Sequence, residues 1–515
     1  MSALTSILAK LLTIGGSVAF VVVIFAFAGT SGRGALLLVA AIGLLASMIW
    51  FTGPQKKFLL GLLFLAAPFD ISQAIVPPLD RIYSPGLYVT IAQAVMLLLG
   101  LLWAAERMLK RHLSMPFTRL DRLGVGFLVL VWFGAMHAQG RVLSFSSAIA
   151  YTLCVLGFYV VSHAVETKSA LRLIMTVVIV GLCLEAVYVA AQMLTHNFLT
   201  LPGAKVAPVG TQGLVFGNEN TASFRPIGSF NHPNALADYL TLLVSPAFAL
   251  VLMSRRRLPA RIWTAALGVL LLGTALLLLT LSRGSWAAAL LGGLFIGSVF
   301  WRTRIIGKGH LLAFLGLGVA GVLATAIIFP QVVLRLTEPD MRSTESRLVL
   351  TDQAVTIIRD HPFIGVGYGG YNLAAHQHTP PSFALISEDY QKQLLELIVH
   401  NHYLLVAAEL GIPAMCYFIF LMLRFVRQAW PLSRWRDPGM FALGVGLSGA
   451  LVSQMLFLAS DNYYVDIRIF LLWITAGLLQ ALTIIAARDA PATATDAGHA
   501  GAAAAATAAS SEMMA

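Results

Sequence analysis

Arginine residues in a few short polar segments are the first candidates for chemistry in this chain. Arg225 lies in the string Phe224-Arg-Pro-Ile-Gly-Ser-Phe-Asn-His-Pro-Asn-Ala235, and Arg283 lies in Leu281-Ser-Arg-Gly-Ser285. The arginine side chain binds phosphate well because its planar fork donates two parallel hydrogen bonds. Few carboxylates accompany these residues, so the segments indicate a site for an anionic substrate.

The segment after Arg225 joins helix-breaking residues to polar ones directly before an apolar run. Its prolines and glycine, with the pair Pro233-Asn234, predict a short loop that enters the membrane. Polar groups at that depth must find partners. Asn231 and Asn234 either cap the following helix or contribute to a site. For Arg225 the sequence favours a functional role.

Two further arginines have two interpretations each. Arg283 lies between two apolar runs with almost no loop, at the outer end of a tight hairpin. It either anchors to lipid phosphate or binds substrate, and the rule that disfavours outer arginines slightly favours the second role. Arg347 opens a predicted amphipathic helix that ends near Asp360, before His361-Pro362. It is either a surface charge or a third ligand for an anion.

The string Val399-His-Asn-His-Tyr-Leu404 supplies the candidate bases, because histidine exchanges a proton near neutral pH. Residues two apart do not share a helix face, and no Cys or Asp cluster accompanies them, so a shared metal ion is poorly supported. One histidine is expected to be catalytic and the other to pack. Fixed cations and one base fit the transfer of a group from a diphosphate to a hydroxyl.

The string Gly365-Val-Gly-Tyr-Gly-Gly370 looks like a phosphate loop but lacks the strand, helix and acidic residue that such loops require. We therefore expect a turn in which two backbone segments approach closely. A second amphipathic helix is expected near Ser387, after Pro380-Pro381.

The composition places these segments in a membrane protein. Of 515 residues, 58% are hydrophobic and 11% are charged, whereas about one quarter of a soluble domain is charged. Soluble enzymes, disordered chains and coiled coils are thereby excluded. We predict an all-α polytopic membrane bundle of about 12–14 spans with a long periplasmic loop carrying amphipathic helices. The predicted spans are 11–29, 34–52, 58–69, 87–105, 124–138, 147–163, 172–194, 234–253, 262–281, 285–300, 310–329, 402–423, 440–459 and 467–487.

The basic residues predict the orientation. With the N-terminus in the cytoplasm, most of the 34 Lys and Arg residues fall on the inside, as the positive-inside rule requires. This rule explains the net charge of +11 without nucleic acid. The first apolar run is long and lacks a clear cleavage site, which indicates a retained helix. The expected units are N-terminal transmembrane helices (1–194), a periplasmic loop (195–233), transmembrane helices (234–329), a large periplasmic loop (330–401), C-terminal transmembrane helices (402–487) and a disordered cytoplasmic tail (488–515).

An ordered set of strings resembles the superfamily of O-antigen ligases and O-antigen polymerases. The strings already quoted around Arg225 and Arg283 are joined by Glu345-Ser-Arg347, His361-Pro-Phe-Ile-Gly-Val-Gly367 and His400-Asn-His-Tyr-Leu404, with Glu409-Leu-Gly411 behind them. Their order and their positions relative to the spans match the superfamily over roughly residues 220–425. The N-terminal spans resemble it only in hydropathy.

The resemblance implies a bacterial inner-membrane glycosyltransferase, multi-pass, with its active site facing the periplasm. Such enzymes use a glycan on undecaprenyl diphosphate, need no cofactor or metal, and invert the anomeric centre. The family's catalytic histidine maps onto His400. Its phosphate-binding arginines map onto Arg225 and Arg283, and Arg347 matches a further family arginine, although Ser346 replaces the usual glycine. Asn401 and His402 complete the expected substrate-binding set.

The acceptor stays open. It is lipid A-core in a ligase, a second lipid-linked repeat unit in a polymerase, and protein in an O-glycosylation ligase. The length of the chain and the segment from Phe69 to Leu87 slightly favour an exopolysaccharide or O-antigen polymerase. The expected partners are the lipid-linked donor, a glycan or lipid A-core acceptor, membrane lipids and polysaccharide assembly proteins. The alternatives from other classes are a flippase or exporter, which would need polar residues along the spans, and a scaffold.

Overall fold

The structure of the protein is a computed structural model. It describes residues 55–76, 87–109, 115–199, 215–216, 223–309, 330–337, 341–385, 388–395, 397–428, 437–463 and 467–489, with the single residues 316, 327 and 430. The predicted spans 11–29 and 34–52, nearly all of 310–329, and the tail beyond Asp489 lie outside the described residues.

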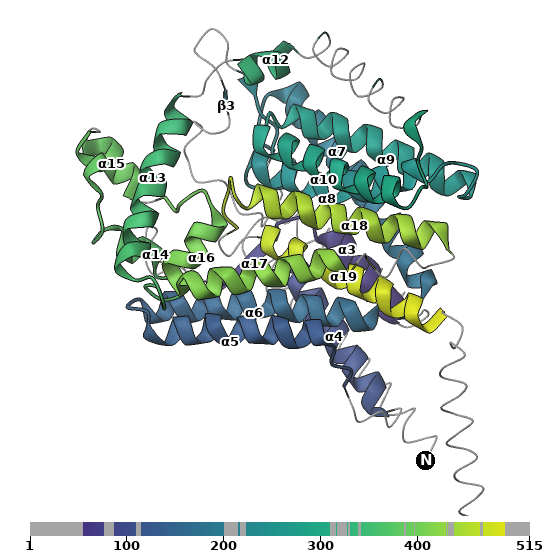
Figure 1. Ribbon diagram of the computed structural model, residues 1–515, viewed down its shortest axis with the longest axis horizontal. Coiled ribbons are helices and arrows are strands. Elements are labelled where there is room, and N and C mark those ends of the chain that lie inside the picture. The colour runs from purple at the N-terminus through teal and green to yellow at the C-terminus, as the bar shows by residue number, and fades with distance from the viewer. Residues whose placement is uncertain are drawn as a thin grey trace, which may run out of the picture.

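Helices make up nearly all of the described chain (Figure 1). They are α3 (Gln55–Ala66), α4 (Ile91–Leu109), α5 (Arg119–His137), α6 (Arg141–Ala164), α7 (Lys168–Thr195), α8 (Pro233–Leu252), α9 (Ala260–Leu279), α10 (Arg283–Arg302), α12 (Pro330–Thr337), α13 (Met341–Asp360), α14 (Tyr371–Ala375), α15 (Glu388–Leu395), α16 (His402–Leu410), α17 (Ile412–Arg427), α18 (Pro438–Phe457) and α19 (Ile467–Asp489). Among the described helices, nine are long and apolar enough to cross a membrane. The predicted all-α polytopic class is confirmed.

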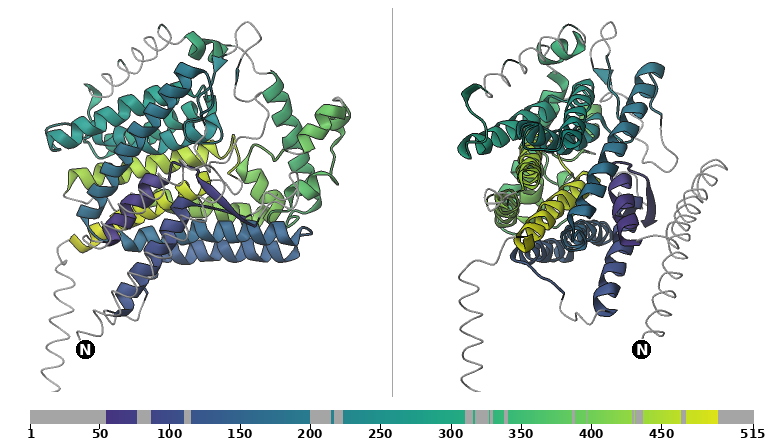
Figure 2. Two further views of the ribbon diagram at one scale, coloured as in Figure 1. Left: turned by 180° about the vertical axis from the view of Figure 1, so that it is seen from behind. Right: turned by 90° about the vertical axis from the view of Figure 1, so that its right-hand side faces the viewer.

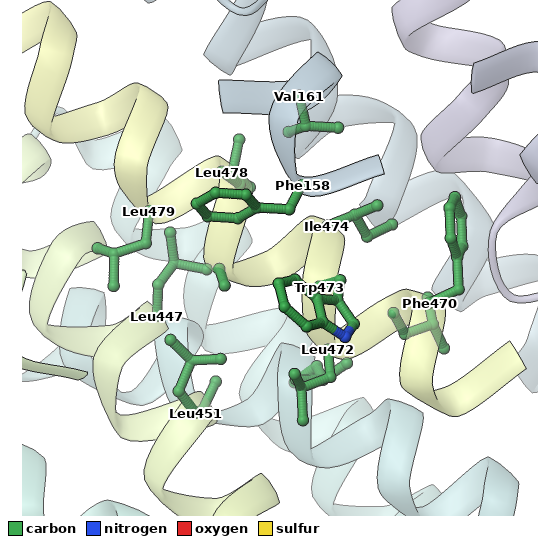
Figure 3. Close-up of a cluster of buried hydrophobic side chains, with 14 of the residues drawn as sticks. Phe158, Val161, Leu447, Leu451, Phe470, Leu472, Trp473, Ile474, Leu478 and Leu479 are labelled. Carbon is green, nitrogen blue, oxygen red and sulfur yellow. The ribbon is translucent and has the colours of Figure 1, made fainter. Parts of the chain in front are cut away.

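The most buried of the long described helices are α6, α8, α18 and α19, and α18 and α19 cross the middle of the bundle (Figures 1 and 2). Phe158 of α6 packs edge-on against Trp473 of α19, with ring centroids 5.9 Å apart, and leucines of α18 close the cluster (Figure 3). Gly477 lets α19 approach α6, because a Cβ there would lie 2.7 Å from the carbonyl oxygen of Phe158. Small residues commonly allow such close packing of membrane helices.

The peripheral helices leave apolar side chains exposed. In α19, 83% of the most apolar stretch is buried, but in α9 only 22%. Leu271 of α9, Val187 of α7 and Leu294 of α10 are exposed. Apolar residues around the whole circumference of a helix are expected where lipid replaces the protein core.

The second long outer segment contains α12 to α15. Helices α13 to α15 lie beside the bundle, on the left of Figure 1, next to α16. Both predicted amphipathic helices are present, as α13 and α15. Val349 and Leu350 of α13 pack with Phe383 and with Leu394 of α15. The polar faces of these helices explain why hydropathy alone does not mark this region as membrane-spanning.

Two local predictions differ from the structure. The predicted span 87–105 begins as strand β2 (Leu87–Thr90), which pairs antiparallel with β1 (Ser72–Val76). Helix α4 starts only after Thr90, because Thr90 and Gln93 form reciprocal side chain–backbone hydrogen bonds of 2.9 and 3.1 Å. A second small ladder joins β3 (Val215–Phe216) to β4 (Ser223–Phe224).

The predicted span 402–423 is two helices, α16 and α17. Gly411 separates them with a φ of 87°, a conformation that favours glycine. The backbone N–H of Ile412 donates to the carbonyl of Pro362 (2.8 Å) instead of continuing α16. The outer segment therefore inserts its chain at the break between the two helices.

Candidate functional site

The loop that carries Arg225 is fixed by polar residues of α7. The side-chain oxygen of Gln192 accepts from the N–H groups of Ile227 (3.1 Å) and Gly228 (3.0 Å). Glu185 accepts from the N–H and the hydroxyl of Ser229. These two residues supply the partners that buried backbone groups require at membrane depth. Glu185 thus supports the loop.

Arg225 is buried, with 6% of its surface exposed. Its Nε donates to the carbonyl of Thr280 (2.9 Å), at the hairpin between α9 and α10. A terminal nitrogen donates to Oδ1 of Asn234 (3.1 Å). The arginine predicted from the first polar segment therefore reaches the segment that carries Arg283.

The sequence left open whether Asn234 caps the following helix or contributes to a site, and in the structure His232 provides the cap. His232 is the N-cap of α8, and its Nδ1 accepts from the N–H of Asn234 (3.0 Å). Burial and the nearby Arg225 lower the pKa of His232 to about 3, so the ring stays neutral and can accept. The Asn234 side chain instead bridges Arg225 and Asp461, with Nδ2 3.4 Å from the Asp461 carboxylate.

Asp461, in the turn between α18 and α19, is the centre of the cluster. Its carboxylate accepts from Arg468 (3.0 Å), from Nδ1 of His400 (3.3 Å) and from Asn234. Burial raises the pKa of Asp461, but the charge of Arg468 and the hydrogen bond from His400 lower it more. The net pKa lies well below its ordinary value, so Asp461 is a carboxylate at neutral pH.

The side chain of His400 is 34% exposed, compared with 8% for Asp461 and 10% for Arg468. With Nδ1–H donating to Asp461, the ring's second nitrogen, Nε2, carries the lone pair. A carboxylate that holds histidine in this tautomer and stabilises the imidazolium is the arrangement of hydrolase triads. His400 can therefore accept a proton from a substrate hydroxyl.

The neighbours of His400 have different environments. Asn401 caps α16, with Oδ1 accepting from the N–H of Leu404 (3.1 Å). His402 is buried, and its backbone N–H donates to the carbonyls of Leu458 (2.8 Å) and Asp461 (3.1 Å). Its ring packs against Phe418 at 5.4 Å between centroids. Of these two histidines, it is His400 whose side chain contacts the carboxylate of Asp461.

The glycine string before α14 fixes α16 from outside. Gly365, Gly367 and Gly369 all have positive φ values, and the predicted close approach is confirmed. The N–H groups of Val366 and Gly367 each donate at 2.9 Å to carbonyls of Ala408 and Glu409. A Cβ on Gly365 would clash with the backbone of Glu409. This turn holds the helix that begins next to His400.

Arg283 and Arg347 are placed differently. Arg283 is half-buried at the first position of α10, and α10 packs tightly beside the turn that carries Asp461: a Cβ on Gly284 would lie 2.9 Å from the Ser460 hydroxyl. Arg347 is exposed on α13. Within the described residues, no hydrogen bond or ion pair connects it to the cluster around Asp461.

The sequence reasoning missed Asp461 and Arg468. Both lie in the string Asp461-Asn-Tyr-Tyr-Val-Asp-Ile-Arg468, a polar interruption between two predicted spans. That interruption, on the outer side and at the same depth as His400, was the available signal. Among the described residues, no group of three or more His, Cys, Asp or Glu side chains is arranged to hold a metal ion.

Comparison with known families supports the resemblance found in the sequence. Residues 268–419 match the family described as O-Antigen ligase. This stretch contains the hairpin with Arg283, the outer helices α12 to α15 and the loop with His400. A comparison with curated proteins gave no match. The match covers less than a third of the 515-residue chain. This stretch is therefore similar to the O-antigen ligase family.

Proposed function

We propose that this protein transfers a glycan from undecaprenyl diphosphate to a sugar hydroxyl, in the biosynthesis of a surface polysaccharide. The observation that carries the proposal is the pairing of His400 with Asp461 beside Arg225 and the α9–α10 hairpin. A base and fixed cations at one end of a membrane bundle are the two parts that this transfer needs.

His400 is the proposed general base. Its Nε2 accepts the proton of the acceptor hydroxyl while the hydroxyl oxygen attacks the anomeric carbon. Asp461 keeps Nδ1 protonated and stabilises the imidazolium that forms. The bond between the anomeric carbon and the phosphate oxygen breaks as the new glycosidic bond forms, so a single displacement inverts the anomeric centre. The imidazolium then loses its proton to the released diphosphate or to water.

Arg225 and Arg283 are the proposed ligands of the diphosphate. Negative charge grows on the leaving oxygen as its bond to the sugar breaks, and fixed cations nearby stabilise that charge more than the ground state. Arg225 is held by Thr280 and Asn234, so little reorganisation is needed when substrate binds. Guanidinium groups in this role make the transfer independent of metal.

The other predicted substrate-binding residues have weaker support. Asn401 and His402 support the position of His400 through the cap of α16 and through packing. Arg347 is exposed on α13, so it can meet only the part of a substrate that extends beyond the bundle.

The proposed location is the periplasmic face of a bacterial inner membrane. Helices α8, α10, α16 and α19 all begin at the end of the bundle that holds the site. At the opposite end, Lys168 binds Asp437 (3.4 Å) and Asp489 (3.0 Å). Among acceptors we favour a second lipid-linked repeat unit, hence a polymerase, because the segment from Phe69 to Leu87 resembles those of exopolysaccharide polymerases.

The test is reconstitution of the purified full-length chain in lipid nanodiscs with an undecaprenyl-diphosphate oligosaccharide. A lipid-linked repeat unit, lipid A-core and a glycan-accepting peptide are offered separately, and products are identified by mass. We expect a donor glycan joined to one acceptor, with release of undecaprenyl diphosphate. His400→Ala is expected to abolish most turnover.

A transporter gives the opposite pattern. In proteoliposomes it would move the lipid-linked glycan across the bilayer without forming a new glycosidic bond. Translocation by both the wild type and His400→Ala, with no product from any acceptor, would overturn the proposed function.

A further inference from the structure

Two arginine side chains meet the hairpin between α9 and α10 in the same way. Arg225 donates from Nε to the carbonyl of Thr280 (2.9 Å), and Arg335 of α12 donates from Nε to the carbonyl of Leu281 (3.2 Å). Both arginines are buried, with 6% and 8% of their surfaces exposed. Arg283 follows Leu281 by two residues and is itself part of the hairpin. One short hairpin thus carries one arginine and is contacted by two more.

The hairpin offers these carbonyls because α9 ends there. The last carbonyls of a helix have no partner within the helix. Leu281, with a φ of 51°, then turns the chain in the left-handed region. In both arginines the bond to the hairpin comes from Nε, and in Arg225 a terminal nitrogen also donates to Oδ1 of Asn234 (3.1 Å). The positive charge of both guanidinium groups is thus held at the hairpin, and guanidinium is the side-chain cation best suited to phosphate.

Helix α10 adds a favourable field at the same place. It begins at Arg283, and the side chain of its N-cap Ser282 accepts no hydrogen bond from the backbone N–H groups of the first turn but pairs with the hydroxyl of Ser285 (3.0 Å). The positive end of a helix favours anions, and the unused N–H groups of its first turn can donate to them. A second helix, α8, begins next to Arg225. An anion at the hairpin would meet both helix ends and the arginines together.

We propose that Arg335 is a third phosphate-binding arginine of the lipid-diphosphate site. This inference rests on the proposed function and assigns the third cation to α12, where the sequence had suggested Arg347 of α13. A diphosphate esterified at both ends carries two negative charges, and a third appears when the sugar leaves. The three positive charges of Arg225, Arg283 and Arg335 equal the negative charge of the leaving diphosphate. Arg335 makes α12 part of the diphosphate site.

The test measures binding of undecaprenyl diphosphate and of undecaprenyl phosphate to the full-length protein in nanodiscs. Arg335→Ala is compared with the wild type, with Arg335→Lys and with Arg359→Ala, a control that removes an exposed arginine of α13. Loss of one charge-assisted hydrogen bond costs about 1.5–3 kcal/mol. Arg335→Ala is therefore expected to weaken diphosphate binding by roughly 10- to 100-fold, with a smaller loss for the monophosphate.

Arg335→Lys keeps the charge but not the Nε bond or the fork, and is expected to lose about half of that effect on a logarithmic scale. If size-exclusion chromatography shows that Arg335→Ala is unfolded, the binding measurement on Arg335→Lys replaces it. Wild-type binding of the diphosphate by both Arg335 variants would overturn this inference alone. Loss of binding in Arg347→Ala instead would assign the third cation to α13. Failure of the wild type to bind the diphosphate would overturn the proposed function as well.

Discussion

Replacement of Asp461 with asparagine tests the proposed base directly, because it removes one charge and almost no volume. The carboxylate now binds Nδ1 of His400 at 3.3 Å and Arg468 at 3.0 Å. An asparagine at this position offers an uncharged oxygen or an N–H group to the ring. His400 then loses the carboxylate that fixes its tautomer and stabilises its charged form.

The expected effect follows from the distance. Two unit charges 3.3 Å apart attract by about 5 kcal/mol at an effective dielectric of about 20. Arg468 already neutralises part of the Asp461 charge, and solvent screens the exposed side of His400. About 3–4 kcal/mol therefore remains to stabilise the imidazolium in the transition state. At about 1.36 kcal/mol for each factor of ten, turnover is expected to fall by roughly 10²–10³.

A loss of folding must be separated from a loss of chemistry. Asp461→Asn leaves Arg468 as a buried charge without its carboxylate, and such a change commonly costs about 3–5 kcal/mol of unfolding free energy. The double variant Asp461→Asn with Arg468→Gln removes that charge. We expect it to regain thermal stability in detergent but not turnover, since His400 still lacks its carboxylate.

The assay is the initial rate of glycan transfer at saturating donor, with undecaprenyl diphosphate binding as an independent measure of folding. Turnover is expected to fall while binding of the diphosphate stays within about threefold, because the arginines of the hairpin are unchanged. If Asp461→Asn, correctly folded, turns over as fast as the wild type, His400 does not act as a base supported by this carboxylate.

Three further predictions concern neighbouring residues. His400→Ala is expected to lower turnover by roughly 10²–10⁴ without weakening donor binding. His402→Ala is expected to lower stability more than turnover. If His400→Ala is active and a folded His402→Ala is inactive, His402 and not His400 is the base. Arg283→Ala and Arg283→Lys are both expected to lose most transfer because a lysine cannot reproduce the fork, and full activity of Arg283→Lys would reduce Arg283 to a lipid anchor. The pKa of His232, lowered to about 3 from 6.5, means that the unfolded chain binds one more proton between these values, so stability falls as pH drops below 6.5. His232→Asn, which keeps an acceptor for the cap, is expected to flatten this dependence in thermal unfolding, and an unchanged pH profile would show that the cap does not titrate.

Hydropathy and helix-breaking residues were sufficient to predict most of the bundle. They place α8, α9 and α10 to within a few residues, since each is a long apolar run bounded by polar or helix-breaking residues. The break at Gly411 was not predicted, because Glu409-Leu-Gly-Ile reads as a continuous apolar run apart from one carboxylate. What breaks it is a tertiary contact, the hydrogen bond from Ile412 to Pro362.

The candidate site could be predicted only in part, for a related reason. Arg225, Arg283 and His400 stand out because each interrupts or borders an apolar run in a recognisable string. Asp461 becomes significant only through partners 61 and 227 residues away in sequence, His400 and Asn234. Arg335 becomes significant only because α12 returns to the hairpin at Leu281. Single-chain spacing cannot show which distant segments meet.

The arginines at the two ends of the bundle differ in burial. Helix α8 has 20 residues, so its ends lie about 30 Å apart. The arginines that follow its C-terminal end and flank α10 on that side are exposed to solvent: Arg255, Arg256, Arg257, Arg302 and Arg304. At the other end Arg225, Arg335 and Arg468 are all buried, and each is bound to a carbonyl or a carboxylate. Exposed arginines need no partner and can set orientation by charge alone. Buried arginines are costly unless the fold or a ligand compensates them. Asp461 compensates the charge of Arg468, whereas Arg225 and Arg335 donate to uncharged backbone carbonyls, and an anionic substrate at this end is the role that we propose for these two.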